Sequence, residues 1–135
     1  MEYTEENRGC IQYHNRMRQV IDFSGLRDET ITPTDIDGYI DYRNKGFIVF
    51  EYKHVNATFS KGQRIALERI IDNFRRAGKK AALFLCRHHQ PTCEDIKGAD
   101  AVVESIYYDG EWNPGQGLTA KQWVDLFMDY YKSLG

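Results

Sequence analysis

The 135-residue sequence lacks both the long apolar segments of a membrane protein and the basic excess of a protein that coats nucleic acid. No apolar run approaches the roughly 20 residues that a membrane-spanning helix needs, and no signal-peptide pattern opens the chain. Lysine and arginine number 18 against 20 acidic residues, for a formal net charge of −2. This balance argues against binding of nucleic acid by charge alone. We therefore expect a cytoplasmic protein with no membrane contact, in which any contact with nucleic acid is local.

Proline is also scarce, with three residues, and no repeat, low-complexity tract or linker divides the chain. Hydrophobic residues make up 41% and charged residues 28%, which is ordinary for a soluble globular protein. A chain of this length forms one core. We expect a single domain over residues 1–135.

Hydrophobic periodicity predicts an α/β fold with a mixed β-sheet flanked by helices. The expected order is helix (7–22), two-stranded hairpin (34–53), helix (60–78), buried strand (81–86), strand (101–108) and a helix from Thr119. A short strand is also expected near 29–32, whereas 109–117 has the composition of a turn-rich segment. A helix followed closely by a buried strand predicts a crossover back onto the sheet.

Two helices carry clear start signals. Ser60 with Gln63, and Thr119 with Gln122, have the spacing of a capping box, in which each side chain binds a backbone N–H of the other residue. Gly78 predicts the end of the first of these helices. Gln63 therefore has two compatible interpretations, as a cap of its own helix or as part of a site.

Residues 34–54, TDIDGYIDYRNKGFIVFEYKH, have the pattern of a β-hairpin. Glu51 and Lys53 share one face of the second strand, and Asp35 and Asp37 share one face of the first. An odd number of loop residues would bring the two faces together, whereas an even number would separate them. We expect an odd, three-residue loop in which Gly46 takes the left-handed position.

Carboxylates that are gathered in this way repel one another and raise each other's pKa. A hard divalent cation such as Mg²⁺ removes the conflict, because it takes carboxylate oxygens while it keeps several waters. The cation can activate a bound water and neutralise charge on a phosphate, and a neighbouring lysine can hold either group. The alternative is an ordinary solvated hairpin face, with Lys53 as a cross-strand ion-pair partner.

Asp37 followed by Glu51-Tyr52-Lys53 resembles the D…(D/E)-x-K signature of the PD-(D/E)XK nuclease superfamily. The resemblance implies a restriction-endonuclease-like αβββαβ core. It also implies that Asp37, Glu51 and the backbone carbonyl of Tyr52 bind Mg²⁺ or Mn²⁺, and that Lys53 positions or activates the attacking water. Gln63, on the helix that follows, is similar to a glutamine found in several branches and would order Lys53, the water or a phosphate. We place Asp35 as an auxiliary metal ligand.

The resemblance implies a metal-dependent nuclease that hydrolyses phosphodiester bonds of DNA. Small stand-alone members of this kind are similar to proteins of phages and prophages, and many relatives work as dimers, so a homodimer is one expected arrangement. Lys61 and Arg64, at the start of the second helix, are the expected phosphate contacts. The alternatives are a catalytically inactive nuclease-fold module that binds nucleic acid, and a protein-interaction module of a mobile element that acts against host defence.

A zinc site is the less favoured metal hypothesis. Cys86, His88, His89 and Cys93 are close in sequence, but their spacing fits no standard pairing. Cys86 also belongs to the apolar run 81–86, which predicts a buried thiol.

Overall fold

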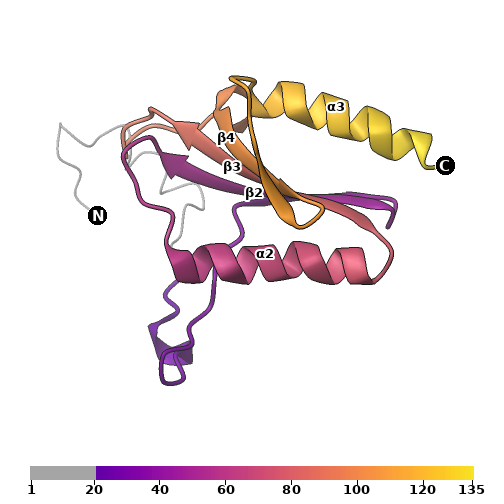
Figure 1. Ribbon diagram of the computed structural model, residues 1–135. Coiled ribbons are helices and arrows are strands. Elements are labelled where there is room, and N and C mark those ends of the chain that lie inside the picture. The colour runs from indigo at the N-terminus through magenta and orange to yellow at the C-terminus, as the bar shows by residue number, and fades with distance from the viewer. Residues whose placement is uncertain (1–20) are drawn as a thin grey trace. The chain divides into compact units, whose positions relative to one another are not determined.

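The computed structural model describes residues 21–135 (Figure 1). The chain forms two compact units, one from Met1–Asp35 with Gln90–Ile96 and the other from Ile36–His89 with Lys97–Gly135. The helix predicted over 7–22 lies almost wholly outside the described residues. The expectation of one domain over 1–135 stays a prediction.

The described part of the first unit contains short, local structure. A 3-10 helix spans Ser24–Leu26, and Asp28 and Ile31 form an isolated bridge closed by two backbone hydrogen bonds of 2.8 and 2.9 Å. The predicted strand near 29–32 is wrong. Glu29 has a φ of 56°, so the chain turns between the bridged residues instead of extending.

The second unit contains a five-stranded sheet of order β1-β2-β3-β4-β5. Its elements are β1 (Gly38–Tyr42), β2 (Gly46–His54), α2 (Lys61–Arg76), β3 (Lys80–His88), a 3-10 helix (Gly98–Asp100), β4 (Val102–Tyr108), β5 (Glu111–Pro114) and α3 (Ala120–Ser133). Only β2 and β3 pair in parallel, and the other three pairs are antiparallel. The predicted α/β class and mixed sheet are confirmed, as is the crossover through α2.

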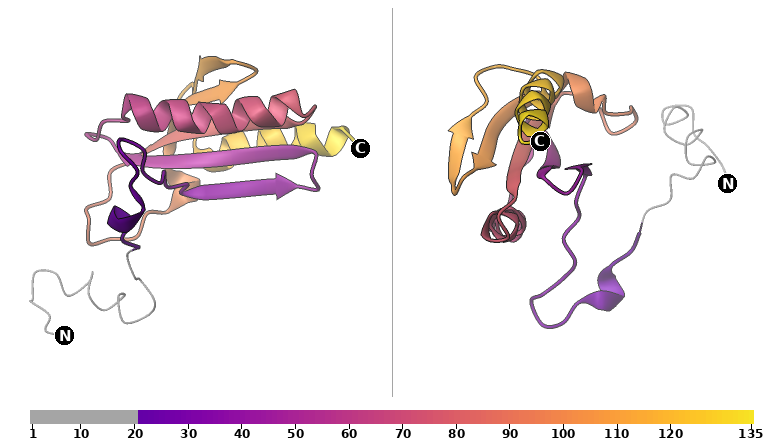
Figure 2. Two further views of the ribbon diagram at one scale, coloured as in Figure 1. Left: turned by 90° about the horizontal axis from the view of Figure 1, so that it is seen from below. Right: turned by 90° about the vertical axis from the view of Figure 1, so that its right-hand side faces the viewer.

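The two helices cover opposite faces of the sheet (Figures 1 and 2). Alternate residues of β2 divide between the two cores, because side chains of a strand alternate in direction. Phe47 and Val49 pack with Leu67 of α2, whereas Ile48 and Phe50 pack with the α3 side. The strand is therefore buried on both faces, as is typical of a parallel pair in an α/β fold.

The hairpin loop has the expected odd length. Tyr42 pairs with Gly46, so three residues form the turn. The expectation that Gly46 takes the left-handed position is wrong, because Arg43 and Asn44 have the positive φ angles, 50° and 61°. The Asp41 carboxylate stabilises this turn by accepting a 2.8 Å hydrogen bond from the Asn44 N–H.

Gly46 is instead required by the packing of α3. A β-carbon at this position would overlap the ring of Tyr131, which is fully buried. The Tyr131 hydroxyl donates a 2.8 Å hydrogen bond to the carbonyl of Phe47, the next residue of β2. Tyr131 thus connects the last helix to the beginning of β2.

Helix α2 ends in a Schellman motif. The Gly78 N–H donates to the Arg75 carbonyl at 2.9 Å, the Lys79 N–H donates to the Phe74 carbonyl at 3.0 Å, and Gly78 has a φ of 80°. The chain then enters β3 directly, and Cys86 of this strand is a fully buried free thiol. Burial raises the pKa of this thiol to about 12.

Two elements differ from expectation. Residues 111–114 form the edge strand β5, although Pro114 and the glycines around it indicated only a turn-rich segment. In the described residues, two strands precede α2, whereas the resembled αβββαβ pattern has three.

No helix among residues 21–135 combines the length and the apolar character needed to cross a membrane.

We predict that Gly46→Ala destabilises the protein by about 1–3 kcal/mol, the usual cost of forcing extra volume into a packed core. Gly46 does not have a positive φ, so the change tests the contact with Tyr131 alone. Gly62→Ala is the control, because a β-carbon there meets nothing within 4 Å and alanine favours a helix. Urea unfolding measures both variants, and equal stability of Gly46→Ala and the wild type would contradict the packing described here.

Candidate active site

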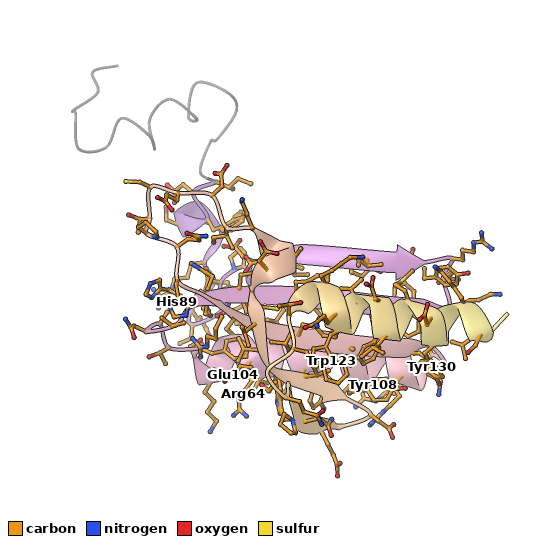
Figure 3. All side chains as sticks on the ribbon, turned by 90° about the horizontal axis from the view of Figure 1, so that it is seen from above. Arg64, His89, Glu104, Tyr108, Trp123 and Tyr130 are labelled. Atoms are coloured by element: carbon orange, nitrogen blue, oxygen red, sulfur yellow. The ribbon has the colours of Figure 1, made fainter. Side chains whose placement is uncertain are left out.

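The candidate site lies on the α2 face of the sheet, at the C-terminal end of β2. Glu51 and Lys53 lie near this end, and β1 begins at Gly38, opposite Phe50. If the antiparallel register of β1 and β2 continues one residue beyond the Gly38–Phe50 pair, Asp37 lies opposite Glu51. The ends of parallel strands in an α/β sheet are where ligands generally bind. Figure 3 shows this end of the sheet, marked by His89, with Arg64 and Glu104 nearer to it than Tyr130.

Asp37 is held against β2 although it precedes the first strand. Its Oδ2 accepts a 2.8 Å hydrogen bond from the Tyr52 N–H. The N–H and C=O of one strand residue point to the same neighbour, so the Tyr52 carbonyl is directed to the same edge as Asp37. An acidic side chain and a backbone oxygen are thereby directed to one place.

Glu51 is the buried centre of the site, with 1% of its surface exposed. Its Oε2 accepts a 2.9 Å hydrogen bond from Gln63 Nε2 and lies 3.1 Å from Lys53 Nζ. Its Oε1 is buried and has no hydrogen-bond partner among the described residues. A carboxylate oxygen in this state is costly unless a proton or a cation joins it.

The environment favours the protonated form of Glu51. Burial raises the pKa of its carboxyl above the usual value, and the nearby Asp37 carboxylate raises this pKa further. The hydrogen bond and the charge of Lys53 lower the same pKa, but the net shift is upward. A divalent cation between the two carboxylates would act in the opposite direction and favour their charged forms.

Gln63 supplies half of the predicted capping box and one contact of the site. Its backbone N–H donates to Ser60 Oγ at 3.2 Å, but its side chain binds Glu51 instead of returning to the Ser60 backbone. In α3 the corresponding box is complete, because the Gln122 side chain accepts from the Thr119 N–H at 2.9 Å. The difference shows that Gln63 is diverted to the buried carboxylate.

The other predicted residues lie in different surroundings. Lys61 is the exposed first residue of α2, and the Arg64 side chain is 42% exposed and 3.9 Å from Glu68. Asp35 belongs to the first unit, so its auxiliary role stays a prediction.

His54, which ends β2, was not among the predicted site residues. The parallel register sets it beside His88 at the end of β3, with ring centroids 5.6 Å apart. Burial, with His54 and His89 nearby, lowers the pKa of His88. The crossover predicted from the sequence makes β2 and β3 parallel and aligns their ends. It is therefore the sequence feature from which the proximity of His54 and His88 could have been predicted.

The oxygen ligands of this site fit Mg²⁺ better than zinc. In the described part of the chain, no three His, Cys, Asp or Glu side chains form a group that could hold a metal ion. Asp37, Glu51 and the Tyr52 carbonyl offer only oxygen, and Mg²⁺ is commonly held by one or two carboxylates with several waters. The unpartnered Glu51 Oε1 is the observation that fits a cation here. Cys86, by contrast, lies in the core and is not a ligand candidate.

No family model, curated protein or solved structure matches the chain. The site is therefore interpreted from its own geometry and from the resemblance carried by its residues.

We predict that neighbouring charges shift the titration of Glu51 in opposite directions. Asp37→Asn should lower the pKa of Glu51, and Lys53→Met should raise it, because these two neighbours have opposite effects on the carboxyl. Asp129→Asn, at an exposed position of α3, should leave it unchanged. Carboxyl-carbon NMR titration measures each value, and a Glu51 pKa that ignores Asp37 would show that the two groups do not interact.

The same shift predicts how stability depends on pH without added metal. The pKa of Glu51 is raised in the folded state, so its contribution is fully present below the unfolded value near 4.5 and is lost as pH rises through the folded value. Asp37→Asn should lower the folded-state pKa of Glu51. It should therefore narrow the pH window, between the unfolded and the folded pKa, over which this contribution to stability is lost. Urea unfolding across the range measures it, and a window of unchanged width in Asp37→Asn would contradict the assignment.

Proposed function

We propose that this chain is a Mg²⁺-dependent nuclease of the PD-(D/E)XK type that hydrolyses phosphodiester bonds of DNA in the cytoplasm. The observation that carries the proposal is the convergence of Asp37 and Lys53 on the buried carboxyl of Glu51, whose Oε1 has no hydrogen-bond partner among the described residues. A role in DNA processing of a phage or prophage, and a homodimeric state, belong to the same proposal.

The proposal assigns each side chain a separate task. Asp37, Glu51 and the Tyr52 carbonyl would hold the cation, which would supply charge stabilisation on the phosphate and a more acidic water. Lys53 would donate to the attacking water or to a phosphate oxygen from the same face of β2. Gln63 would hold the Glu51 carboxylate in place through Oε2, so that the other oxygen is directed to the cation.

The arrangement of elements supports the proposed relationship in part. The strand that bears Glu51 and Lys53 is followed by the helix that bears Gln63 and then by a parallel strand. The hairpin partner of that strand begins directly after Asp37. The described residues depart from a restriction-endonuclease-like core by having two strands before the helix, with β4 and β5 added after it.

The second candidate is an inactive module of the same kind that binds nucleic acid or a protein partner of a mobile element, as an anti-defence protein would. The observation that favours it is the direct ion pair between Lys53 and Glu51, at 3.1 Å, together with the Asp37 bond to Tyr52. These contacts satisfy the lysine and one aspartate oxygen within the protein. An inactive module would bind its partner without cleaving DNA.

We predict that Asp37→Asn, Glu51→Gln and Lys53→Met each lower the cleavage rate by about 100-fold or more, as expected for groups that stabilise charge or transfer protons. Asp129→Asn and Lys132→Met change the same residue types at exposed positions of α3 and should keep full activity. Cleavage of single- and double-stranded DNA with Mg²⁺ or Mn²⁺, and with chelator, measures this. Equal rates in the site variants and the controls would contradict the assignment.

We also predict that Mg²⁺ stabilises the wild type, by about 2.7 kcal/mol at 100 times its dissociation constant. Glu51→Gln should lose this gain, because it removes the buried anion. Lys53→Met should keep or increase it, because it removes a competing cation. Thermal unfolding with and without Mg²⁺ measures the effect. A Glu51→Gln variant that is stabilised as strongly as the wild type would place the ion elsewhere.

A further inference from the structure

A cavity of about 460 Å³ opens on the same face of the sheet as the carboxylates. It lies between the loop after β2, the first half of α2 and the strands β3 to β5. The lining side chains that matter for its chemistry are Phe59, Arg64, Leu85, Glu104, Ser105 and Trp112.

The cavity is next to the candidate site by strand register. Leu85, on its floor, pairs with Glu51 of the neighbouring strand. Adjacent strands lie about 4.8 Å apart, so the floor of the cavity is one strand away from the buried carboxylate. Gln63 and Arg64 are consecutive on α2, and the first contacts Glu51 while the second lines the cavity.

Two aromatic rings give the cavity a firm apolar wall. Phe59 and Trp112 meet edge to face, with centroids 6.4 Å apart. Trp112 also packs on Tyr107 at 5.4 Å, and its indole N–H donates to Glu68 at 2.5 Å. A ring held from two sides loses little freedom when a ligand stacks on it, and stacking of a nucleobase on such a ring contributes about 1–3 kcal/mol.

The two arginines that line the cavity differ in their contacts within the protein. Arg87 donates to Glu104 at 2.8 Å, to the His54 carbonyl at 3.1 Å and to the Ala57 carbonyl at 2.5 Å, so it fixes the loop and the wall. Arg64 has only a 3.9 Å contact with Glu68, and its side chain is 42% exposed. Because Glu68 already accepts from Trp112, Arg64 is the cation suited to a phosphate.

We propose that this cavity receives one nucleobase of the substrate strand, stacked on Phe59 with its edge against Trp112, while Arg64 contacts the adjoining phosphate. A base within a duplex is stacked and paired and cannot enter such a cavity without being extruded. The preferred substrate is therefore single-stranded or locally unpaired DNA. This inference rests on the proposed nuclease function for the position of the cleaved bond, but the base-binding step does not require cleavage.

Fluorescence of Trp112 tests the inference directly. The chain has two tryptophans, and Trp123→Phe leaves Trp112 as the only one. Oligothymidylate, a duplex of equal length and an abasic oligonucleotide are titrated in chelator, so that no cleavage occurs. Oligothymidylate should quench Trp112, and the duplex and the abasic strand should not. Equal quenching by all three would overturn the proposal, because it would report backbone contact alone.

Two variants in the Trp123→Phe background separate stacking from charge. Phe59→Leu should weaken oligothymidylate binding by about 5- to 150-fold, the equivalent of one stacked base. Arg64→Met should weaken it and reduce the salt dependence of binding by about one phosphate contact. Arg76→Met, at the other end of α2, is the control and should bind normally. Unchanged affinity in Phe59→Leu would overturn the base cavity.

The results separate this inference from the proposed function. Selective quenching by oligothymidylate in a protein that cleaves no DNA would support the cavity and reject the nuclease. Asp37-dependent cleavage at equal rates on single and double strands, without quenching, would support the nuclease and reject the cavity.

Discussion

The candidate site depends on how one buried carboxylate, that of Glu51, is accommodated in the sheet. Glu51 lies on a strand covered by α2 on one face and α3 on the other, where an isolated charge is strongly disfavoured. Lys53 and Gln63 offset the cost at Oε2, and nothing among the described residues does so at Oε1. The start of α2 adds to the balance, since the positive end of a helix dipole stabilises a nearby anion by about 0.3–1 kcal/mol. The residue is thus prepared for a positively charged partner.

The position of Asp37 relative to Glu51 is fixed at the other end of the hairpin. A three-residue turn sets the parity of the two strands, and a change of one residue would direct Asp37 to the opposite face. That turn is closed by Asp41 and is packed beneath Tyr131, whose ring occupies the space above Gly46. Packing of the last helix therefore supports the register on which the site depends, although α3 contributes no side chain to it.

The sequence predicted the parts that depend on local pattern. The hairpin, α2, β3, β4 and α3 have strong periodicity and clear caps, and the faces of Glu51 and Asp37 followed from counting residues once the loop was taken as odd. The sequence could not predict the features that depend on contacts between distant residues, such as the edge strand β5 and the role of Gly46. The strand β5 contains Pro114, which is tolerated because β5 is an edge strand. The role of Gly46 comes from Tyr131, which is 85 residues away in the chain.

The first turn of α2 connects the two halves of the proposed site. Ser60 fixes where the helix begins, and the helix then presents Gln63 to the carboxylate and Arg64 to the cavity. Arg87 of β3 donates to the carbonyls of His54, at the end of β2, and of Ala57, in the loop before α2, so the start of the helix has little freedom to shift. A strand that placed its base against Trp112 would bring its phosphate toward this turn. The order of residues in one helical turn would thus set the distance between base recognition and the proposed chemistry.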